Sequence, residues 1–86
     1  MINRFCKEVL EFLKSEYNDA YEFNLELTET MDERRIELKI KSGGYTRIIT
    51  NDYMRYFYER YLEKKYLYER NQFKWQKELI DLIEGC

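Results

Sequence analysis

The residues best suited to contact a partner lie between Tyr53 and Trp75. Nine of the chain's fifteen aromatic residues fall in this stretch, and arginines and lysines are interleaved with them. Aromatic rings with basic neighbours can stack on bases and neutralise phosphates, or anchor a protein interface. One face of a helix cannot bury this many rings, so we predict a partner-binding surface. Its candidate residues are Arg55, Tyr56, Arg60, Lys64, Tyr66 and Arg70.

The same stretch has an alternative interpretation as a solvated helix face that neutralises its own charge. Acidic residues stand three or four positions after most of its basic residues, and side chains at that spacing are neighbours on a helix. Lys64 and Arg70 stay without a partner in this scheme. The predicted pairs are Arg55–Glu59, Arg60–Glu63, Lys65–Glu69, Lys74–Glu78 and Lys77–Asp81.

A second candidate surface is acidic and lies earlier in the chain. Clustered carboxylates can imitate phosphates and occupy a basic groove on another protein. Alternatively, they pair across neighbouring strands with Arg35, Lys39 and Lys41, which would neutralise much of the surface. The acidic candidates are Glu22, Glu26, Glu29, Asp32 and Glu33.

The sequence lacks the residue types that most catalytic sites need. It has no histidine, which is the usual general base and the commonest metal ligand. Its three glycines cannot form a phosphate-binding glycine-rich loop. Cys6 and Cys86 are far apart in the sequence, so we expect two reduced thiols. We therefore predict no enzyme activity, no metal site and no cofactor.

Length and composition predict one globular domain over residues 1–86. The net charge of −2 does not favour a general binder of polyanions, which usually carries a basic excess. No stretch is long and apolar enough for a membrane span, and the N-terminus has no signal-peptide pattern. We therefore expect a cytoplasmic protein without a membrane partner.

Hydrophobic periodicity predicts the elements that position these residues. Apolar residues at helical spacing predict a helix over about 3–17. Alternating patterns over 21–28 and 35–41 predict strands, and a third follows over 45–50. The sequence Ser42-Gly43-Gly44 indicates a tight hairpin, because glycine accepts the positive φ that such turns require. The three strands should form an antiparallel meander.

Residues 51–84 contain neither glycine nor proline, yet one helix of this length would be too long for so small a domain. We predict two helices with a break between Lys64 and Gln72, where Asn71 is the best single breaker. Asn51 or Asp52 should cap the first helix, and Gly85 should follow the last. On the first helix Tyr53, Phe57, Tyr58 and Tyr61 should face inward, with Tyr56 and Tyr66 pointing away. The predicted class is a two-layer α+β domain of order α-β-β-β-α-α.

This element order resembles that of a small phage-encoded inhibitor of Cas9, one of the anti-CRISPR proteins. The resemblance implies a non-enzymatic protein that occludes a functional surface of a host protein, such as a CRISPR effector or another defence complex. The family member contacts its target through acidic residues between its second and third strands. Here the corresponding stretch, residues 41–47, is basic at both ends. A contact surface in this chain would therefore differ.

The first five predicted elements are also similar to a double-stranded-RNA-binding domain, which implies nucleic acid as an alternative partner. That family carries a lysine cluster at the start of its last helix. Here the stretch from Thr50 to Arg55 contains one aspartate and a single arginine. A protein partner is therefore preferred over nucleic acid. A homodimer is a further alternative, because exposed aromatic surface on a small domain often marks a self-association face.

Overall fold

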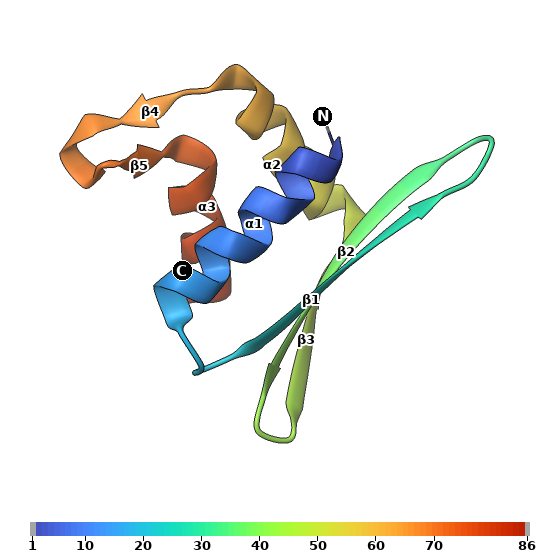
Figure 1. Cartoon of the computed structure of the whole chain (residues 1–86), viewed down its shortest axis with the longest axis horizontal. Helices are drawn as coiled ribbons and strands as arrows, with labels where there is room; N and C mark the ends of the chain where they lie inside the picture. Colours follow the sequence, from blue (N-terminus) through green and yellow to red (C-terminus); the bar gives the residue numbers. More distant parts are fainter. Residues whose placement is uncertain (1, 86) are drawn as a thin grey trace. The chain divides into compact units, whose positions relative to one another are not determined.

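The computed structural model describes residues 2–85 of the chain (Figure 1). They form two compact units, one ending at Met54 and the other beginning at Arg55. The predicted α+β class is confirmed, with an N-terminal helix, a three-stranded antiparallel sheet and C-terminal helices; the single-domain organisation stays a prediction. The elements are α1 (Ile2–Tyr17), β1 (Glu22–Glu29), β2 (Arg34–Ser42), β3 (Tyr45–Ile49), α2 (Asn51–Glu63), β4 (Tyr66–Leu67), the short 3-10 helix η1 (Tyr68–Arg70), β5 (Gln72–Phe73) and α3 (Lys74–Ile83).

Helix α1 buries the apolar side that its sequence spacing predicts. Phe5, Val9 and Leu13 recur at helical spacing and are fully buried. The helix ends at Tyr17 because Asn18 takes a left-handed backbone conformation, and the Asn18 N–H donates to the carbonyl of Lys14 at 2.9 Å. The predicted helix and its end are confirmed.

The three strands form an antiparallel meander in the order β1-β2-β3. In its register Leu25 lies opposite Leu38, and Leu38 lies opposite Ile49, so the apolar residues share one face. Helix α1 packs against β1, which gives the N-terminal unit two layers. The residues on the apolar face of the sheet are Phe23, Leu25, Leu27, Ile36, Leu38, Ile40 and Ile49.

Strands β2 and β3 are joined by the predicted tight turn. Ser42 pairs with Tyr45, which leaves only Gly43 and Gly44 between the strands. Gly43 has a φ of 62°, a conformation that other residues adopt only with strain. The glycine signal in the sequence thus marked the turn correctly.

The junction between β3 and α2 depends on Asn51, which is buried. Extending the register by two residues beyond the pair Leu38 and Ile49 places Asn51 opposite Ile36. The Ile36 N–H donates to Asn51 Oδ1 at 2.8 Å. Asn51 or Asp52 was predicted to cap α2, but α2 already includes Asn51. The carboxamide oxygen of Asn51 instead accepts the hydrogen bond from the Ile36 N–H, where a strand carbonyl would accept it if β3 continued.

The C-terminal unit contains two helices separated by a small hairpin. Helix α2 ends at Glu63, because Lys64 takes a positive φ of 56°. Strands β4 and β5 then pair antiparallel around η1, which lies between them (orange in Figure 1). The predicted break between the helices is confirmed, and Asn71 does take a left-handed conformation within it. The paired strands inside the break were not predicted.

Helix α3 has a buried side formed by Trp75 and Leu79. The Trp75 ring meets the Tyr61 ring of α2 edge-on, at 5.9 Å between centroids. At the start of α3 the Phe73 N–H donates to Gln76 Oε1 at 2.8 Å, which satisfies one otherwise unpaired helix-terminal donor. Gly85 follows the helix with a φ of 79°, as predicted.

One predicted orientation on α2 is wrong. Tyr53 was expected to face inward, but 53 % of its surface is exposed. Phe57 is buried as predicted, and Met54 is buried as well, so the inward direction of α2 lies between them and Tyr53 falls at its margin. No helix in residues 2–85 has the length and apolar character required to cross a membrane.

Candidate partner-binding site

The six predicted contact residues of the aromatic-basic stretch fall into two structural groups. Arg55, Tyr56 and Arg60 lie on α2, whereas Lys64, Tyr66 and Arg70 lie in or beside the β4–β5 hairpin. Tyr56 and Arg60 contact each other, whereas Tyr66 contacts residues of the hairpin, namely Tyr68, Phe73 and Asn71. The two groups contact different residues within the C-terminal unit. These contacts determine which side chains of each group remain available to a partner.

Tyr56 and Arg60 belong to a polar cluster that links α2 to α3. The Arg60 guanidinium lies 4.9 Å from the centroid of the Tyr56 ring, and it forms an ion pair with Glu63. The carboxylate of Glu78 on α3 interacts with the Tyr56 hydroxyl and raises the pKa of that phenol. We call these four residues the helix clasp. Because their side chains bond to one another, Tyr56 and Arg60 stabilise the unit and are poor probes of a partner surface.

The helix clasp makes a prediction about titration. The hydrogen bond to the Glu78 carboxylate raises the pKa of Tyr56, burial raises it further, and Arg60 partly opposes both. The raised pKa means that the phenol keeps its proton at a pH where free tyrosine, with a value of 10.0, has lost half of it. NMR titration of tyrosine ring carbons should therefore place the Tyr56 midpoint above 10.0, with its signal identified in a Tyr56→Phe spectrum.

The control for this titration is Glu78→Gln. Removing the carboxylate charge takes away the largest cause of the shift, so the Tyr56 midpoint should fall towards its ordinary value. An unchanged midpoint in this variant would mean that Tyr56 and Glu78 do not interact in solution.

The β4–β5 hairpin has a defined backbone despite its small size. At its base the Lys74 N–H donates to the Lys65 carbonyl at 2.8 Å. At its tip the Asn71 N–H donates to the Tyr68 carbonyl at 3.2 Å, and the Tyr66 hydroxyl donates to Asn71 Oδ1. These bonds fix the turn, so the rings it carries are held in place before any partner arrives.

Three aromatic rings cluster on this hairpin. The Tyr66 ring lies at the centre, 5.1 Å from the Tyr68 ring and 5.1 Å from the Phe73 ring, with edge-on geometry in both contacts. Tyr66 is half-buried by its neighbours, whereas Tyr68 is 85 % exposed and Phe73 is 37 % exposed. We call Tyr66, Tyr68 and Phe73 the hairpin aromatic cluster. Its outermost ring projects into solvent.

The basic residues around the hairpin aromatic cluster are only partly neutralised. Lys65 pairs with Glu63 at 3.4 Å, and Lys74 lies 4.0 Å from Glu78. Within residues 2–85 neither Lys64 nor Arg70 has an acidic side chain within ion-pair distance. Two positive charges without a counter-ion therefore accompany the exposed rings.

The predicted pairs along this stretch were partly right. Those of Arg60 with Glu63, Lys74 with Glu78 and Lys77 with Asp81 are present. The pair of Lys65 with Glu69 is wrong, because the helix has ended before Lys65 and the four-residue spacing no longer brings side chains together. In the described part of the chain Arg55 makes no ion pair with Glu59, although both lie on α2.

Tyr68 and Phe73 were missed as candidate contact residues. Helical phasing predicts which rings of a helix point outward, and it does not apply across a hairpin. The available signal was Asn71, which tolerates a left-handed conformation and has an aromatic-aliphatic pair, Tyr66-Leu67, on one side and Phe73 on the other.

The acidic candidates are mostly neutralised by neighbouring bases. Glu26 pairs with Lys39 at 3.1 Å, Glu29 with Arg34 at 3.6 Å and Glu33 with Arg35 at 3.0 Å. Glu22 lies opposite Lys41 in the register, without a contact of ion-pair length, and Asp32 is not among the paired residues of the described chain. The pairs of Glu26 and Glu29 join β1 to β2, as the cross-strand interpretation predicts, whereas Glu33 pairs with Arg35 two residues along the chain.

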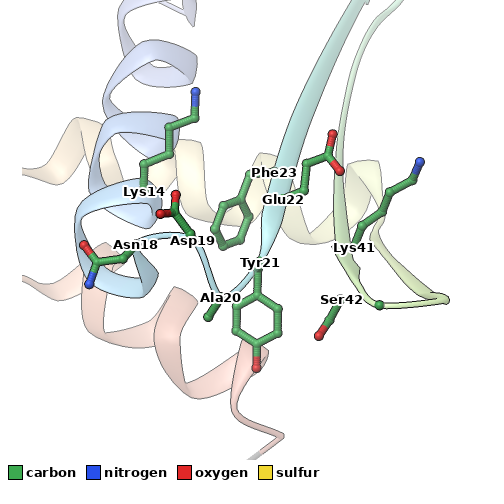
Figure 2. A pocket seen from close by; sticks show the side chains of 10 residues that line it. Lys14, Asn18, Asp19, Ala20, Tyr21, Glu22, Phe23, Lys41 and Ser42 are labelled. Carbon is green, nitrogen blue, oxygen red and sulfur yellow. The ribbon is translucent and has the colours of Figure 1, made fainter.

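A polar hollow of about 910 Å³ lies in the N-terminal unit (Figure 2). It is bounded by the end of α1, the turn that precedes β1 and the tip of the β2–β3 hairpin. Its charges are mixed, with Lys14 and Lys41 alongside Asp19 and Glu22. Such a balance gives no preference for one class of ligand.

Reactive groups are few among residues 2–85. Burial raises the pKa of the Cys6 thiol, which outweighs the lowering by a backbone hydrogen bond, so the thiol is a weaker nucleophile than a free one at neutral pH. No cluster of three or more cysteine or acidic side chains in this part of the chain could hold a metal ion. Comparison with protein-family models, with curated proteins and with solved structures gave no match to the chain.

Proposed function

We propose that the chain is a non-enzymatic protein-binding module whose contact surface is centred on the β4–β5 hairpin. The observation that carries this proposal is the exposure of Tyr68, at 85 %, on a turn fixed by hydrogen bonds. Tyrosine and arginine are enriched among the residues that dominate binding energy at protein interfaces. Arg70 stands two residues from Tyr68 and has no acidic partner in the described chain. The surface therefore comprises Lys64, Tyr66, Tyr68, Arg70 and Phe73.

Preorganisation supports the same proposal. Association is opposed by the entropy of ordering flexible side chains and loops. In the hairpin, the contacts of Tyr66 with Tyr68, Phe73 and Asn71 already restrict the rings and the turn. A partner would gain the burial of Tyr68 at a smaller ordering cost than from a mobile loop.

The biological role we propose is inhibition by occlusion. In this proposal the exposed ring of Tyr68 anchors the chain on another protein, and the bound chain covers a functional surface there. The proposed target is a host defence protein in the cytoplasm, such as a CRISPR effector, and the proposed source is a phage or mobile element. This part of the proposal is supported by the order of the three main helices and the three-stranded sheet, which resembles that of a known Cas9 inhibitor once the short elements β4, η1 and β5 are left out. Element order by itself does not identify the family.

The experiment is capture from a bacterial lysate by the immobilised chain, with and without nuclease treatment. Wild type should retain a discrete protein band after nuclease treatment, and Tyr68→Ala should lose it. We expect the affinity for the captured protein to fall by roughly tenfold or more, as for a central interface tyrosine. The matched control is Tyr45→Ala, which removes a tyrosine that is 72 % exposed beside the β2–β3 turn.

The outcomes separate the functions. Equal binding by Tyr68→Ala and wild type would exclude the hairpin as the contact surface. Loss of all captured material on nuclease treatment would favour nucleic acid instead. Equal loss in Tyr45→Ala and Tyr68→Ala would mean that exposed tyrosines bind without specificity.

A further inference from the structure

We infer that the partner of the hairpin is a protein surface on which a small group of carboxylates surrounds an apolar recess. This inference rests on the proposed function and adds the chemistry of the partner. The hairpin presents an apolar knob, in which Tyr68 is the most exposed ring, together with the unpaired cations of Lys64 and Arg70. A complementary surface needs a recess for the ring and negative charge beside it.

The distribution of charge along the chain supports an acidic partner. Residues 64–74 contain four basic residues and one acidic residue, a net charge of +3. The remaining residues contain eleven basic and sixteen acidic residues, a net charge of −5. The hairpin is therefore a positive segment in an otherwise negative chain. Attraction to an acidic patch is strongest for a docking orientation that places the hairpin against it.

The same distribution argues against a nucleic-acid strand as the partner. A strand carries a charge on every nucleotide, so a site for it needs a groove of bases that follows the backbone. Among the described basic residues of the hairpin, only Lys64 and Arg70 have no acidic side chain at ion-pair distance, and the negative net charge of the rest of the chain repels a long polyanion. The edge-on contacts of Tyr66 with Tyr68 and Phe73, at 70° and 84°, form a rounded cluster and do not form a flat stacking ladder. A compact acidic patch on a protein fits these features better.

The test uses the full-length chain labelled with ¹⁵N and a set of defined probes. The first probe is a short peptide of alternating glutamate and leucine, and its control replaces glutamate by glutamine. The others are an oligothymidylate and vesicles containing phosphatidylserine. We expect the glutamate peptide to shift the amide signals of residues 64–74, with affinity that weakens as salt rises. The glutamine peptide should bind at least about tenfold more weakly.

Charge variants provide the second readout. Lys64→Gln combined with Arg70→Gln should weaken binding of the glutamate peptide by roughly tenfold or more. Lys7→Gln combined with Lys41→Gln changes the net charge equally at exposed sites outside the hairpin and should leave the affinity within about twofold of wild type. Both variants replace exposed lysines or arginine, so the fold is expected to persist.

Three results would overturn the inference. These are hairpin shifts that appear only with oligothymidylate, shifts that appear only with vesicles, and equal binding of the glutamate and glutamine peptides. Failure of the proposed function is separate, because it is read from lysate capture by Tyr68→Ala. In one combination of results, Tyr68→Ala loses the captured protein while the glutamate peptide leaves the hairpin signals of the wild-type chain unchanged. That combination would support the proposed binding function and contradict the acidic partner.

Discussion

Leu79→Ala should lower the free energy of unfolding by about 2–5 kcal/mol, because it truncates a fully buried leucine. Leu79 is fully buried on α3, beside Trp75. Alanine removes apolar surface from the interior and leaves a cavity that its neighbours can fill only in part. Trp75 is retained as a fluorescent reporter, so urea unfolding followed by tryptophan emission measures the effect in the C-terminal unit.

The matched control is Leu62→Ala on α2. The substitution is identical, but Leu62 is 43 % exposed, so little burial is lost and alanine favours the helix. A change within about 0.5 kcal/mol is expected there. Similar losses in both variants would contradict the packing of α3. Circular dichroism in the same urea series tests the single-domain prediction, since one cooperative domain requires its transition to coincide with that of Trp75 fluorescence.

Asn51→Ala should lower the free energy of unfolding by about 1–3 kcal/mol, the cost of leaving a buried donor unpaired. The Ile36 N–H lies in the interior of the N-terminal unit, and its acceptor is Asn51 Oδ1 at 2.8 Å. Alanine removes the acceptor and offers no route for water to replace it. Urea unfolding measures the loss, and amide exchange at Ile36 should accelerate beyond the change explained by global stability.

Two controls isolate the hydrogen bond at Asn51. Asn24→Ala removes an exposed carboxamide from β1 and should change stability by less than about 0.5 kcal/mol. Asn51→Asp keeps an acceptor oxygen in the same position, so the Ile36 amide should stay protected from exchange. Rapid exchange at Ile36 in Asn51→Asp, or full stability in Asn51→Ala, would contradict the assigned role.

The elements of the fold were predictable because burial imposes a period on the sequence. The helical spacing of Phe5, Val9 and Leu13 and the alternation in β1 and β2 are direct consequences of one buried side. Glycine marked the β2–β3 turn, because Gly43 needs a positive φ. These signals come from residues close together in the sequence, so they can be recognised without knowledge of the tertiary structure.

The candidate site was less predictable, because its geometry depends on the break between helices. Strands β4 and β5 have two residues each, which is too short for the alternation of apolar and polar residues that identifies a strand in a sequence. The role of Tyr56 in the helix clasp depends on Glu78, which is 22 positions away and on another element.

The role of Asn51 was also hidden in the sequence, because it depends on tertiary structure. Its side chain matched a capping signal, and only the register of the sheet reveals its bond to Ile36.

The bond from the Lys74 N–H to the Lys65 carbonyl closes the β4–β5 hairpin at its base. The residues between Lys65 and Lys74 therefore form a closed loop, and its two ends lie next to each other where α2 has ended and α3 begins. New tip sequences of equal length can therefore be exchanged while the helices keep their attachment points, provided that a residue tolerant of positive φ stays at position 71. The hairpin is thus a natural position at which to randomise residues and select this scaffold for new specificities.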